Sequence, residues 1–307
     1  MLDLLDVTIR DGGYVNDHGW TCNVAAQIMR TMTEAGIFHT EVGYLRDQHD
    51  PDRPSASCPP AYLEQLASEC TRARITVMIR PGEVSERRIA ELPQLGVNTV
   101  RVLAPNGDVS RAAPYLDAAT AAGLRTSANL IRISEVDPAS LASTVRRCVS
   151  AGADIVYLAD SNGSMFPNQV REHVEAALVA AAGKAQIGFH PHDNLSMAFI
   201  NACVAVDAGA ESVDASLGGI GKGGGNLRID LIAAYWKVRY GTPIHVTPLL
   251  RKGSLVNDEL IKVAAGVPIS LVSGLLNLNI DQLAALPSTE SHTKYDELLT
   301  STTSEKS

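Results

Sequence analysis

Short runs of apolar and β-branched residues alternate along the chain with longer, alanine-rich stretches. Runs of this length and composition are typical of buried parallel strands, and we expect eight of them. They cover residues 4–9, 38–44, 74–79, 97–104, 124–130, 153–159, 185–190 and 211–217. The stretches between them, such as 25–36 and 141–153, have the apolar spacing of an amphipathic helix. The pattern therefore predicts eight strand–helix units in series.

Several of the predicted helices end in an alanine–glycine pair directly before the next strand, at Gly36, Gly123, Gly152 and Gly209. Glycine readily takes the left-handed conformation that closes a helix, so these pairs support the boundaries. Eight such units predict an α/β fold, a (β/α)8 TIM barrel with parallel strands. An open, doubly wound sheet is disfavoured, because no glycine-rich dinucleotide-binding motif follows the first strand.

The barrel is expected to span residues 1–242, with its last helix at about 227–240. Residues 243–287 are expected to form a short helical C-terminal extension, since their apolar residues have helical spacing. Residues 288–307 are polar, which predicts a disordered tail. A length of 307 residues alone would suggest two domains, but α/β barrels often use this much chain as one.

Composition and charge mainly argue against certain classes of partner and site. The chain is 45% apolar and 20% charged, as globular proteins are. Its net charge of −8, without a stripe of Lys and Arg, argues against nucleic acid as a partner. The apolar runs are too short to span a membrane, and no signal peptide is expected. The five cysteines are scattered and lack the spacing of metal ligands, which predicts reduced thiols in a cytoplasmic protein.

Two histidines, His190 and His192, stand one residue apart at the end of the seventh predicted strand. Residues i and i+2 of a strand face the same side. Both imidazoles are therefore expected at the C-terminal mouth of the barrel, where barrel enzymes hold their catalytic groups. Two adjacent imidazoles can form half of a metal site. The alternative is a pair of hydrogen-bonded histidines in a loop.

The first strand brings a cation and a carboxylate to the same end of the barrel. The segment TIRDGG carries Arg10 and Asp11, and one strand separates it from the strand of the histidines. One carboxylate and two imidazoles suit a divalent metal that also binds substrate. A fixed arginine can hold a carboxylate or the negative oxygen of an enolate. Taken alone, Asp11 before two glycines would be an ordinary turn residue.

A glycine-rich loop follows the eighth predicted strand, with six glycines within residues 218–225. Such a loop lets backbone approach a ligand closely, or forms a flexible lid. It is not a P-loop, because Asn226 rather than Ser or Thr follows the glycines. Asn226 either caps the last helix or completes the metal shell. Further polar residues near strand ends are candidates for substrate contacts: Glu41, Asn129, Asp160 and Ser161.

The segments TIRDGG, ADSNG, HPHDNLS and DASLGGIGKGGGN, in this order and at these strand ends, resemble the DRE-TIM metallolyase superfamily. Within it they look most like the 4-hydroxy-2-oxovalerate aldolases, which are HMGL-like aldolases. The resemblance covers residues 3 to about 240. It implies Asp11, His190 and His192 as metal ligands, with Asn226 as a less firmly matched fourth. It further implies Arg10 as the residue that stabilises the enolate, and Ser161 as a contact to the oxo acid.

Two positions depart from the pattern of these aldolases. Their histidine base, three residues after the metal-binding aspartate, is replaced here by Tyr14, and the C-terminal segment ISLVSGLLNL lacks their tyrosine. We expect His18 to serve as the base, because an ordinary histidine titrates near neutrality. Tyr14 is a candidate proton donor, and it would need a strongly lowered pKa to act as a base.

The resemblance implies a carbon–carbon lyase, a pyruvate aldolase of the class II type. It would cleave or form a 4-hydroxy-2-oxo acid, from a 2-oxo acid such as pyruvate and an aldehyde, through an enolate bound to Mn²⁺ or Mg²⁺. The alternatives are a Claisen-type synthase that uses acyl-CoA and a catalytically degenerate barrel with a binding role. The glycine-rich loop has no cysteine, which disfavours thioester cleavage. A homo-oligomer and an aldehyde dehydrogenase partner are further expectations.

Overall fold

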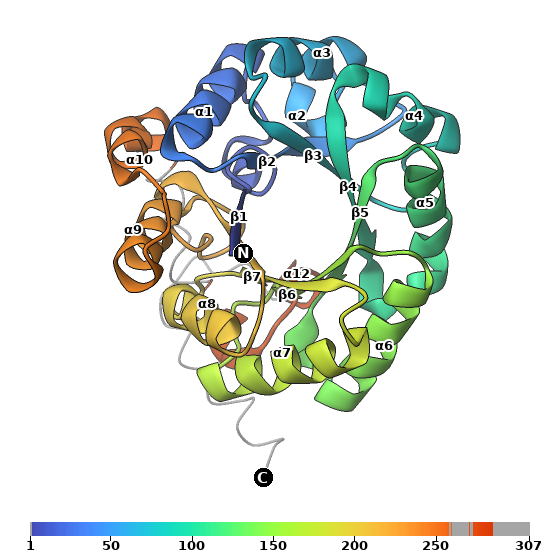
Figure 1. Ribbon diagram of the computed structural model, residues 1–307, viewed down its shortest axis with the longest axis vertical. Coiled ribbons are helices and arrows are strands. Elements are labelled where there is room, and N and C mark those ends of the chain that lie inside the picture. Colours follow the sequence, from blue (N-terminus) through green and yellow to red (C-terminus); the bar gives the residue numbers. More distant parts are fainter. Residues whose placement is uncertain (1, 258, 260–269, 271–272, 285–307) are drawn as a thin grey trace.

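The computed structural model describes residues 2–257, 259, 270 and 273–284. Eight parallel strands close into a barrel in sequence order, with the helices ringed around it, so the predicted (β/α)8 TIM barrel is confirmed (Figure 1). The strands are β1 (Asp3–Asp6), β2 (His39–Leu45), β3 (Arg74–Ile79), β4 (Val97–Ala104), β5 (Arg125–Ile131), β6 (Ile155–Asp160), β7 (Gln186–Pro191) and β8 (Ser212–Ala215).

The outer ring consists of α-helices, with short 3₁₀ turns in the connections. The helices are α1 (Cys22–Ala35), α2 (Pro54–Ser57), α3 (Pro60–Glu69), α4 (Glu86–Ala90), α5 (Val109–Ala121), α6 (Pro138–Ser150), α7 (Pro167–Ala181), α8 (Ala198–Asp207) and α9 (Ile229–Tyr240). The 3₁₀ turns are η1 (Gly12–Asn16), η2 (Leu92–Leu95), η3 (Pro105–Gly107), η4 (Ile133–Glu135) and η5 (Leu217–Gly219).

Local sequence sets several of these helix boundaries. The Asp137 carboxylate accepts the first free N–H groups of α6, from Ala139 at 3.0 Å and Ser140 at 2.9 Å, and Pro138 opens the helix. At the C-terminal end of α1, Gly36 takes a φ of 86°, and its N–H donates to carbonyl groups of the last helical turn. All four glycines predicted to end helices have positive φ. The alanine–glycine signal in the sequence therefore marks real helix ends.

The strands β3 and β4 match their predicted ranges residue for residue, but β1 does not. Predicted to run to residue 9, it ends at Asp6, whose Oδ1 accepts the Thr8 N–H at 3.0 Å. The N–H groups of Asp11 and Gly12 then both bond to the Val7 carbonyl, at 2.9 and 3.1 Å. Residues 7–11 therefore form a turn above the strand, and the turn rather than the strand carries the first site residues.

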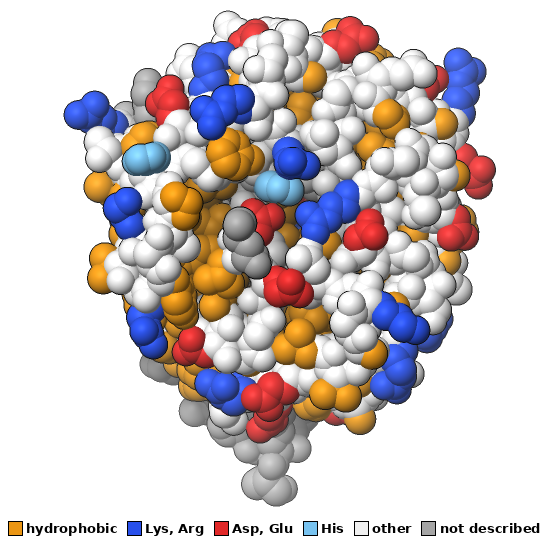
Figure 2. Space-filling model, viewed as in Figure 1, with side chains coloured by type: hydrophobic (Ala, Val, Ile, Leu, Met, Phe, Trp, Pro, Cys, Tyr) orange, Lys and Arg blue, Asp and Glu red, His pale blue; other side chains and the backbone are white. Residues whose placement is uncertain are grey.

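Figure 1 views the barrel from the end at which the strands begin, with the N-terminus at the centre. Figure 2 shows the same face, on which side chains of both charges and a histidine surround the centre. Inside the barrel at this end, Leu5, Val7, Ile155 and Tyr157 form a small apolar cluster. The larger core lies between the strands and the helices. Side chains therefore fill the interior at this end, apart from a cavity of about 10 Å³ beside Leu5, Ile155 and Tyr157.

Fully buried charge lies between this apolar plug and the mouth. Arg101 on β4 is 0% exposed, and its guanidinium stacks over the Tyr157 ring at 3.9 Å. Its Nη2 donates to Asp214 Oδ2 at 2.6 Å and to Asn129 Oδ1 at 3.1 Å. Its Nη1 lies 3.5 Å from Glu41 Oε2. A buried cation of this kind is tolerated only when paired, so Arg101 fixes the carboxylates around it.

Residues beyond the barrel fold back onto it. The helix α10 (Val246–Lys252) packs against α1 and α9, and η6 (Gly253–Val256) follows it. The helix α12 (Ile280–Ala284) lies on the far side in Figure 1. The limits of the predicted extension, 243–287, stay a prediction, and the predicted disordered tail, 288–307, lies outside the described residues. In the part of the chain that the structure describes, no helix is both long and apolar enough to cross a bilayer.

The segment that contains α12 is clasped onto the loops after β5 and β6. The Oδ1 of Asn277 accepts hydrogen bonds from the hydroxyls of Ser134 at 2.8 Å and Ser164 at 2.6 Å. Arg132, directly after β5, forms an ion pair with Asp281 at 2.7 Å. These contacts hold one end of α12 at the rim of the barrel mouth.

Candidate functional site

The C-terminal mouth of the barrel contains a cavity of about 550 Å³. Seven of the residues predicted from the sequence line it: Arg10, Asp11, Tyr14, Asn129, Ser161, His190 and His192. The other four, His18, Glu41, Asp160 and Asn226, are buried and do not line it. Basic and aromatic residues that the sequence analysis did not select also line it: Tyr44, Arg80, Arg132 and Lys222.

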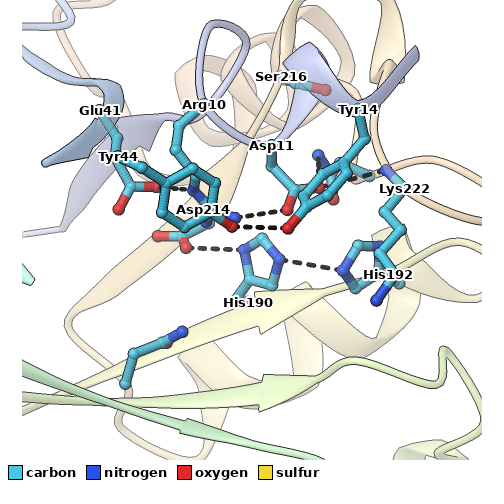
Figure 3. A network of polar contacts seen from close by, with 12 residues as sticks. Arg10, Asp11, Tyr14, Glu41, Tyr44, His190, His192, Asp214, Ser216 and Lys222 are labelled. Atoms are coloured by element: carbon cyan, nitrogen blue, oxygen red, sulfur yellow. Dashed lines mark hydrogen bonds and ion pairs between the residues drawn. The ribbon is translucent and has the colours of Figure 1, made fainter. Parts of the chain in front are cut away.

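His190 and His192 turn the same edge of their rings toward each other. Nδ1 of His190 lies 2.7 Å from Asp214 Oδ2, and Nδ1 of His192 lies 3.1 Å from the Gly225 carbonyl. Both partners are acceptors, so each ring in its neutral form would carry its proton on Nδ1 and a lone pair on Nε2. The two Nε2 atoms are 3.2 Å apart (Figure 3). Two lone pairs at this distance repel each other, and a shared cation relieves the repulsion.

Asp11 completes a three-residue cluster with these histidines, and their ligand atoms lie within 4.8 Å of one another. Burial would raise the pKa of Asp11, but Arg10 and the two histidines outweigh burial and hold that pKa far below its usual range. Burial also lowers the pKa of His192 to about 4, against the opposing effect of Asp11. One ionised carboxylate and two neutral imidazoles fit a divalent metal ion.

Asn226 lies directly beside this cluster, since its backbone pairs with His192. Its Nδ2 donates to Asp11 Oδ2 at 2.9 Å and to the Ile220 carbonyl at 3.0 Å. Its Oδ1 is buried and has no hydrogen-bond partner among the described residues. An orphaned acceptor at this place is compatible with the predicted fourth ligand, which stays a prediction. What the geometry does show is that Asn226 orients the Asp11 carboxylate.

Arg10 is held between two carboxylates, with Nε 2.6 Å from Glu41 Oε2 and Nη1 2.6 Å from Asp11 Oδ1. Burial would lower the pKa of Arg10, but Glu41 and Asp11 outweigh burial and raise it. Its Nη2 has no hydrogen-bond partner among the described residues, although Arg10 lines the cavity. Glu41, predicted to contact substrate, is 0% exposed and lies behind Arg10. Its position corrects that prediction, because Glu41 orients the arginine instead.

Asp214 on β8 is the main residue that the sequence analysis missed. Its Oδ2 accepts from both His190 and Arg101, at 2.7 and 2.6 Å. Burial would raise its pKa, but Arg101 and His190 outweigh burial and lower it. The signal in the sequence was an acidic residue inside a buried strand, which requires a partner. An aspartate behind a metal-binding histidine fixes the tautomer and raises the basicity of the ligand.

Asp214→Asn is expected to weaken divalent-metal affinity by about 10- to 100-fold, the usual cost of removing such a partner. Asparagine still accepts the His190 N–H but carries no charge to balance Arg101. The measurement is competition with a chelating dye, together with the melting temperature of each protein. Asp117→Asn, on an exposed position of α5, is the matched control. Unchanged metal affinity in Asp214→Asn would show that this carboxylate does not tune the site.

Two tyrosines and an arginine form the wall opposite the histidines. The hydroxyls of Tyr14 and Tyr44 are 2.7 Å apart, and Arg80 Nη2 donates to both, at 2.8 and 3.2 Å. Burial and the neighbouring Tyr44 raise the pKa of Tyr14. The protein neighbours of Tyr14 therefore favour its protonated form. This hydroxyl is suited to donating a proton.

His18 lies beneath these rings and does not line the cavity. Its ring centroid is 5.1 Å from that of Tyr14 and 5.6 Å from that of Tyr44, in edge-on contacts. Burial lowers the pKa of His18 to about 4, and Arg10 contributes in the same direction. The expectation of a base that titrates near neutrality is thus wrong for this histidine. Its position is that of a support for the tyrosine pair.

Comparison with known proteins identifies the family. The HMGL-like family model matches residues 1–256. The chain belongs to the HMGL-like family. A 4-hydroxy-2-oxovalerate aldolase of Geobacillus genomosp. 3 is 30% identical over 262 residues, which cover 84% of this chain and 77% of the relative. An oxaloacetate decarboxylase of Mycobacterium tuberculosis is 30% identical over 233 residues, which cover 75% of this chain and 68% of the relative.

Solved structures confirm the fold of this HMGL-like chain. The N-terminal domain of a Bacteroides vulgatus protein superposes with a TM-score of 0.82 at 24% identity, covering 96% of this chain and 99% of that one. The carboxyl transferase domain of Rhizobium etli pyruvate carboxylase gives 0.72 at 17% identity, covering 86% of this chain and 48% of that one. The resemblance inferred from the four sequence motifs is confirmed. Aldolases of the HMGL-like family generally depend on a divalent metal.

The remaining predicted residues of this HMGL-like chain divide between the wall of the cavity and its support. Ser161 and Asn129 line the cavity; the Ser161 hydroxyl accepts the Arg132 N–H at 3.2 Å, and Asn129 accepts from Arg101. Asp160 is fully buried and accepts the Met165 N–H at 3.0 Å. Burial raises the pKa of Asp160 to about 6. Asp160 therefore shapes the turn after β6 and does not face the cavity.

Proposed function

We propose that this HMGL-like protein is a divalent-metal-dependent aldolase that cleaves or forms a 4-hydroxy-2-oxo acid. The observation that carries the proposal is the Asp11–His190–His192 cluster, which opens into the same cavity as the free edge of Arg10. Its single carboxylate, together with the oxygens of an oxo acid, suits Mn²⁺ or Mg²⁺. Such an ion, when bound, supplies Lewis-acid chemistry that polarises the 2-oxo group.

Arg10 is proposed to hold the charge that develops on the substrate. Cleavage of the C3–C4 bond leaves its electron pair on the 2-oxo acid fragment as an enolate. The Arg10 guanidinium is fixed at two of its nitrogens by Glu41 and Asp11, and only Nη2 remains to donate. A donor fixed in advance costs no reorganisation when charge develops, which is the usual source of its catalytic effect. The enolate then takes a proton at C3 to give pyruvate or a longer 2-oxo acid.

The proton at the 4-oxygen is proposed to pass through Tyr14. In the synthetic direction, the aldehyde oxygen becomes a hydroxyl and takes one proton. The Tyr14 hydroxyl lies at the cavity wall, hydrogen-bonded to Tyr44 and Arg80, and its raised pKa keeps it protonated. Tyr44 can return a proton to Tyr14 through the bond between the two hydroxyls. In cleavage, Tyr14 takes the 4-hydroxyl proton as it passes its own proton through Tyr44 to water.

Tyr14→Phe is expected to slow aldol turnover by about a hundredfold, the scale of general acid catalysis. His18→Asn should slow it by less than about tenfold, because His18 only supports the tyrosine rings. His18 stays neutral above its pKa of about 4. The dependence of kcat on pH between 6 and 9 should therefore be the same with His18 present and with His18→Asn. The measurement is kcat against pH, with Tyr240→Phe on the surface as control. A lower kcat for His18→Asn than for Tyr14→Phe would indicate that His18 is the base.

The proposed function is tested by a screen of 2-oxo acids against aldehydes with Mn²⁺ present, read by mass spectrometry. Condensation of pyruvate with at least one aldehyde, abolished by chelator, is the expected result. Consumption of acyl-CoA instead would favour the Claisen-type synthase. Metal-loaded protein that condenses no pair would contradict the proposal and favour a binding role. An oligomer and a dehydrogenase partner stay predictions.

Decarboxylation of a 2-oxo diacid is a second candidate, because it breaks the same C3–C4 bond. A carboxylate leaves as CO₂ without a base at C4, and this chain has Tyr14 in place of the histidine base of the related aldolases. One relative is named an oxaloacetate decarboxylase. Release of CO₂ from oxaloacetate, measured in the same assay, distinguishes this reaction from aldol cleavage.

A further inference from the structure

We infer that the aldehyde fragment of the substrate carries a terminal anionic group, held at the mouth by Lys222 and Arg80. The substrate would then be a 4-hydroxy-2-oxo acid with a second carboxylate or a phosphate at its far end. This inference rests on the proposed aldolase function and specifies its substrate class. It is drawn from the positive charges on the cavity wall. There are more of them than the carboxylate of the oxo acid and the metal ligands would need.

Four basic side chains line the cavity, and only some are neutralised. Arg10 pairs with Asp11 and Glu41, and Arg132 pairs with Asp281 at 2.7 Å. The lining carboxylate of Glu83 is taken by Arg46 at 2.7 Å. Among the described residues, no carboxylate lies within 4.0 Å of Lys222 Nζ or of the Arg80 guanidinium nitrogens, which are therefore the cations left for a ligand. The backbone N–H of Lys222 donates to Asp11 Oδ2 at 3.4 Å and leaves the ammonium free.

Lys222 and Arg80 both lie next to Tyr14. Arg80, directly after β3, donates to the Tyr14 hydroxyl at 2.8 Å. Lys222, in the glycine-rich loop after β8, places Nζ 5.8 Å from the centroid of the Tyr14 ring (Figure 3). Tyr14 is the proposed proton donor to the aldehyde oxygen. The two cations therefore flank the aldehyde fragment, whereas Arg10 and the metal cluster serve the oxo acid.

Both cations are only partly exposed, which makes their missing counter-ions costly. Lys222 and Arg80 are half-buried, and a cation removed from water without a partner loses hydration that nothing replaces. An anionic ligand group restores that loss and gains charge-assisted hydrogen bonds. Three apolar residues also line the cavity, Leu103, Ile131 and Ile280, and can contact a short carbon chain between the reacting centre and the anion. The cavity thus fits a short aldehyde acid.

The reaction balances with no further reactant. A 4-hydroxy-2-oxo diacid loses its 4-hydroxyl proton, the C3–C4 bond breaks, and the enolate takes one proton at C3. The products are pyruvate and an aldehyde that carries the second carboxylate. A phosphorylated analogue follows the same balance. Lys222 and Arg80 keep the anion bound throughout, since no bond to the terminal group changes.

The test compares binding of two ligands that differ only at the far end, 2-oxoadipate and 2-oxohexanoate. Calorimetry uses the full chain loaded with Mn²⁺. The protein is expected to bind the diacid at least tenfold more tightly. Lys222→Met and, separately, Arg80→Met are expected to reduce this preference to about threefold or less, with Lys184→Met, an exposed lysine, as the matched control. Two variants at different loops guard against a folding defect in one of them, which the melting temperature reports.

Equal affinity for the two ligands in the unmodified protein would overturn the inference, as would a preference that survives in both variants. Condensation of pyruvate with 4-oxobutanoate, glyceraldehyde 3-phosphate and butanal then identifies the source of the anion. Faster turnover with either anionic aldehyde than with butanal supports the inference, and faster turnover with butanal overturns it. If the diacid binds selectively while no aldehyde condenses, the inference stands as a binding property and the aldolase proposal fails.

Discussion

His190→Ala is expected to lose its divalent metal and at least about a thousandfold in aldol turnover, while remaining folded. Loss of a hydrogen-bond partner behind a metal ligand lowers metal affinity or activity roughly 10- to 100-fold, and loss of the ligand itself should lower them further. The barrel should survive, because His190 lies at the mouth and Asp214 keeps Arg101 as its partner at 2.6 Å. No buried carboxylate is left alone. The measurements are metal content by elemental analysis, turnover, and circular dichroism of the same preparation.

The matched control for this change is His49→Ala, which removes an exposed histidine that does not line the cavity. It should retain both metal and turnover. Full activity of His190→Ala after chelator treatment would show that the cluster at the mouth is not the metal site. Loss of metal with normal turnover would separate the metal from the reaction.

Arg10→Lys is expected to lower turnover by about a hundredfold or more with metal content unchanged, the scale of one lost donor to a developing oxyanion. Lysine keeps the positive charge but not the planar fork. The fork allows Arg10 to bind Glu41 through Nε and Asp11 through Nη1 while Nη2 remains directed at substrate. A lysine ammonium cannot occupy these three places at once. Single-turnover kinetics with metal-loaded protein measure the effect.

Arg46→Lys provides the control for this substitution, because Arg46 also pairs with a carboxylate and contacts Tyr44 but does not line the cavity. It should turn over at nearly the normal rate. Normal turnover in Arg10→Lys would mean that the enolate is stabilised elsewhere. A fall in both variants alike would indicate a general effect of losing a guanidinium near Tyr44.

The barrel could be predicted from the sequence because its signal is periodic and local. Apolar runs recur eight times with helical spacing between them, alanine–glycine pairs mark four helix ends, and β3 and β4 were placed to the residue. The end of β1 could not be placed, because it depends on one hydrogen bond from the Thr8 N–H to Asp6. The apolar run continues through Ile9, so the composition gives no sign of the turn.

The first residues of the site were predictable because strand ends meet at one mouth. His190 and His192 share a face by their spacing, and the structure brings Asp11 to them. Asp214 was missed because its role depends on which side chains meet inside the barrel, not on neighbours in sequence. Glu41 was misassigned for the same reason, since only its contact with Arg10 shows that it lies behind the wall.

The loop after β1 was the least predictable part of the site. A single histidine in NDHGW gave no sign that its ring would be buried between two tyrosines, or that its φ would be 57°. Tyr44 and Arg80 come from β2 and the end of β3, far from Tyr14 in sequence, yet they form its hydrogen-bond partners. The hydroxyl pair therefore emerges only from the closed barrel.

The central claim is that this mouth forms the enolate of a 2-oxo acid beside a divalent cation. The most direct test is exchange of the C3 protons of pyruvate in D₂O, followed by proton nuclear magnetic resonance. Mn²⁺ broadens resonances, so Mg²⁺-loaded protein is used. The account predicts loss of the methyl signal with the Mg²⁺-loaded protein, and no loss after chelation or in Asp11→Ala. A methyl signal that persists with the loaded protein, or disappears equally fast without metal, would contradict the account.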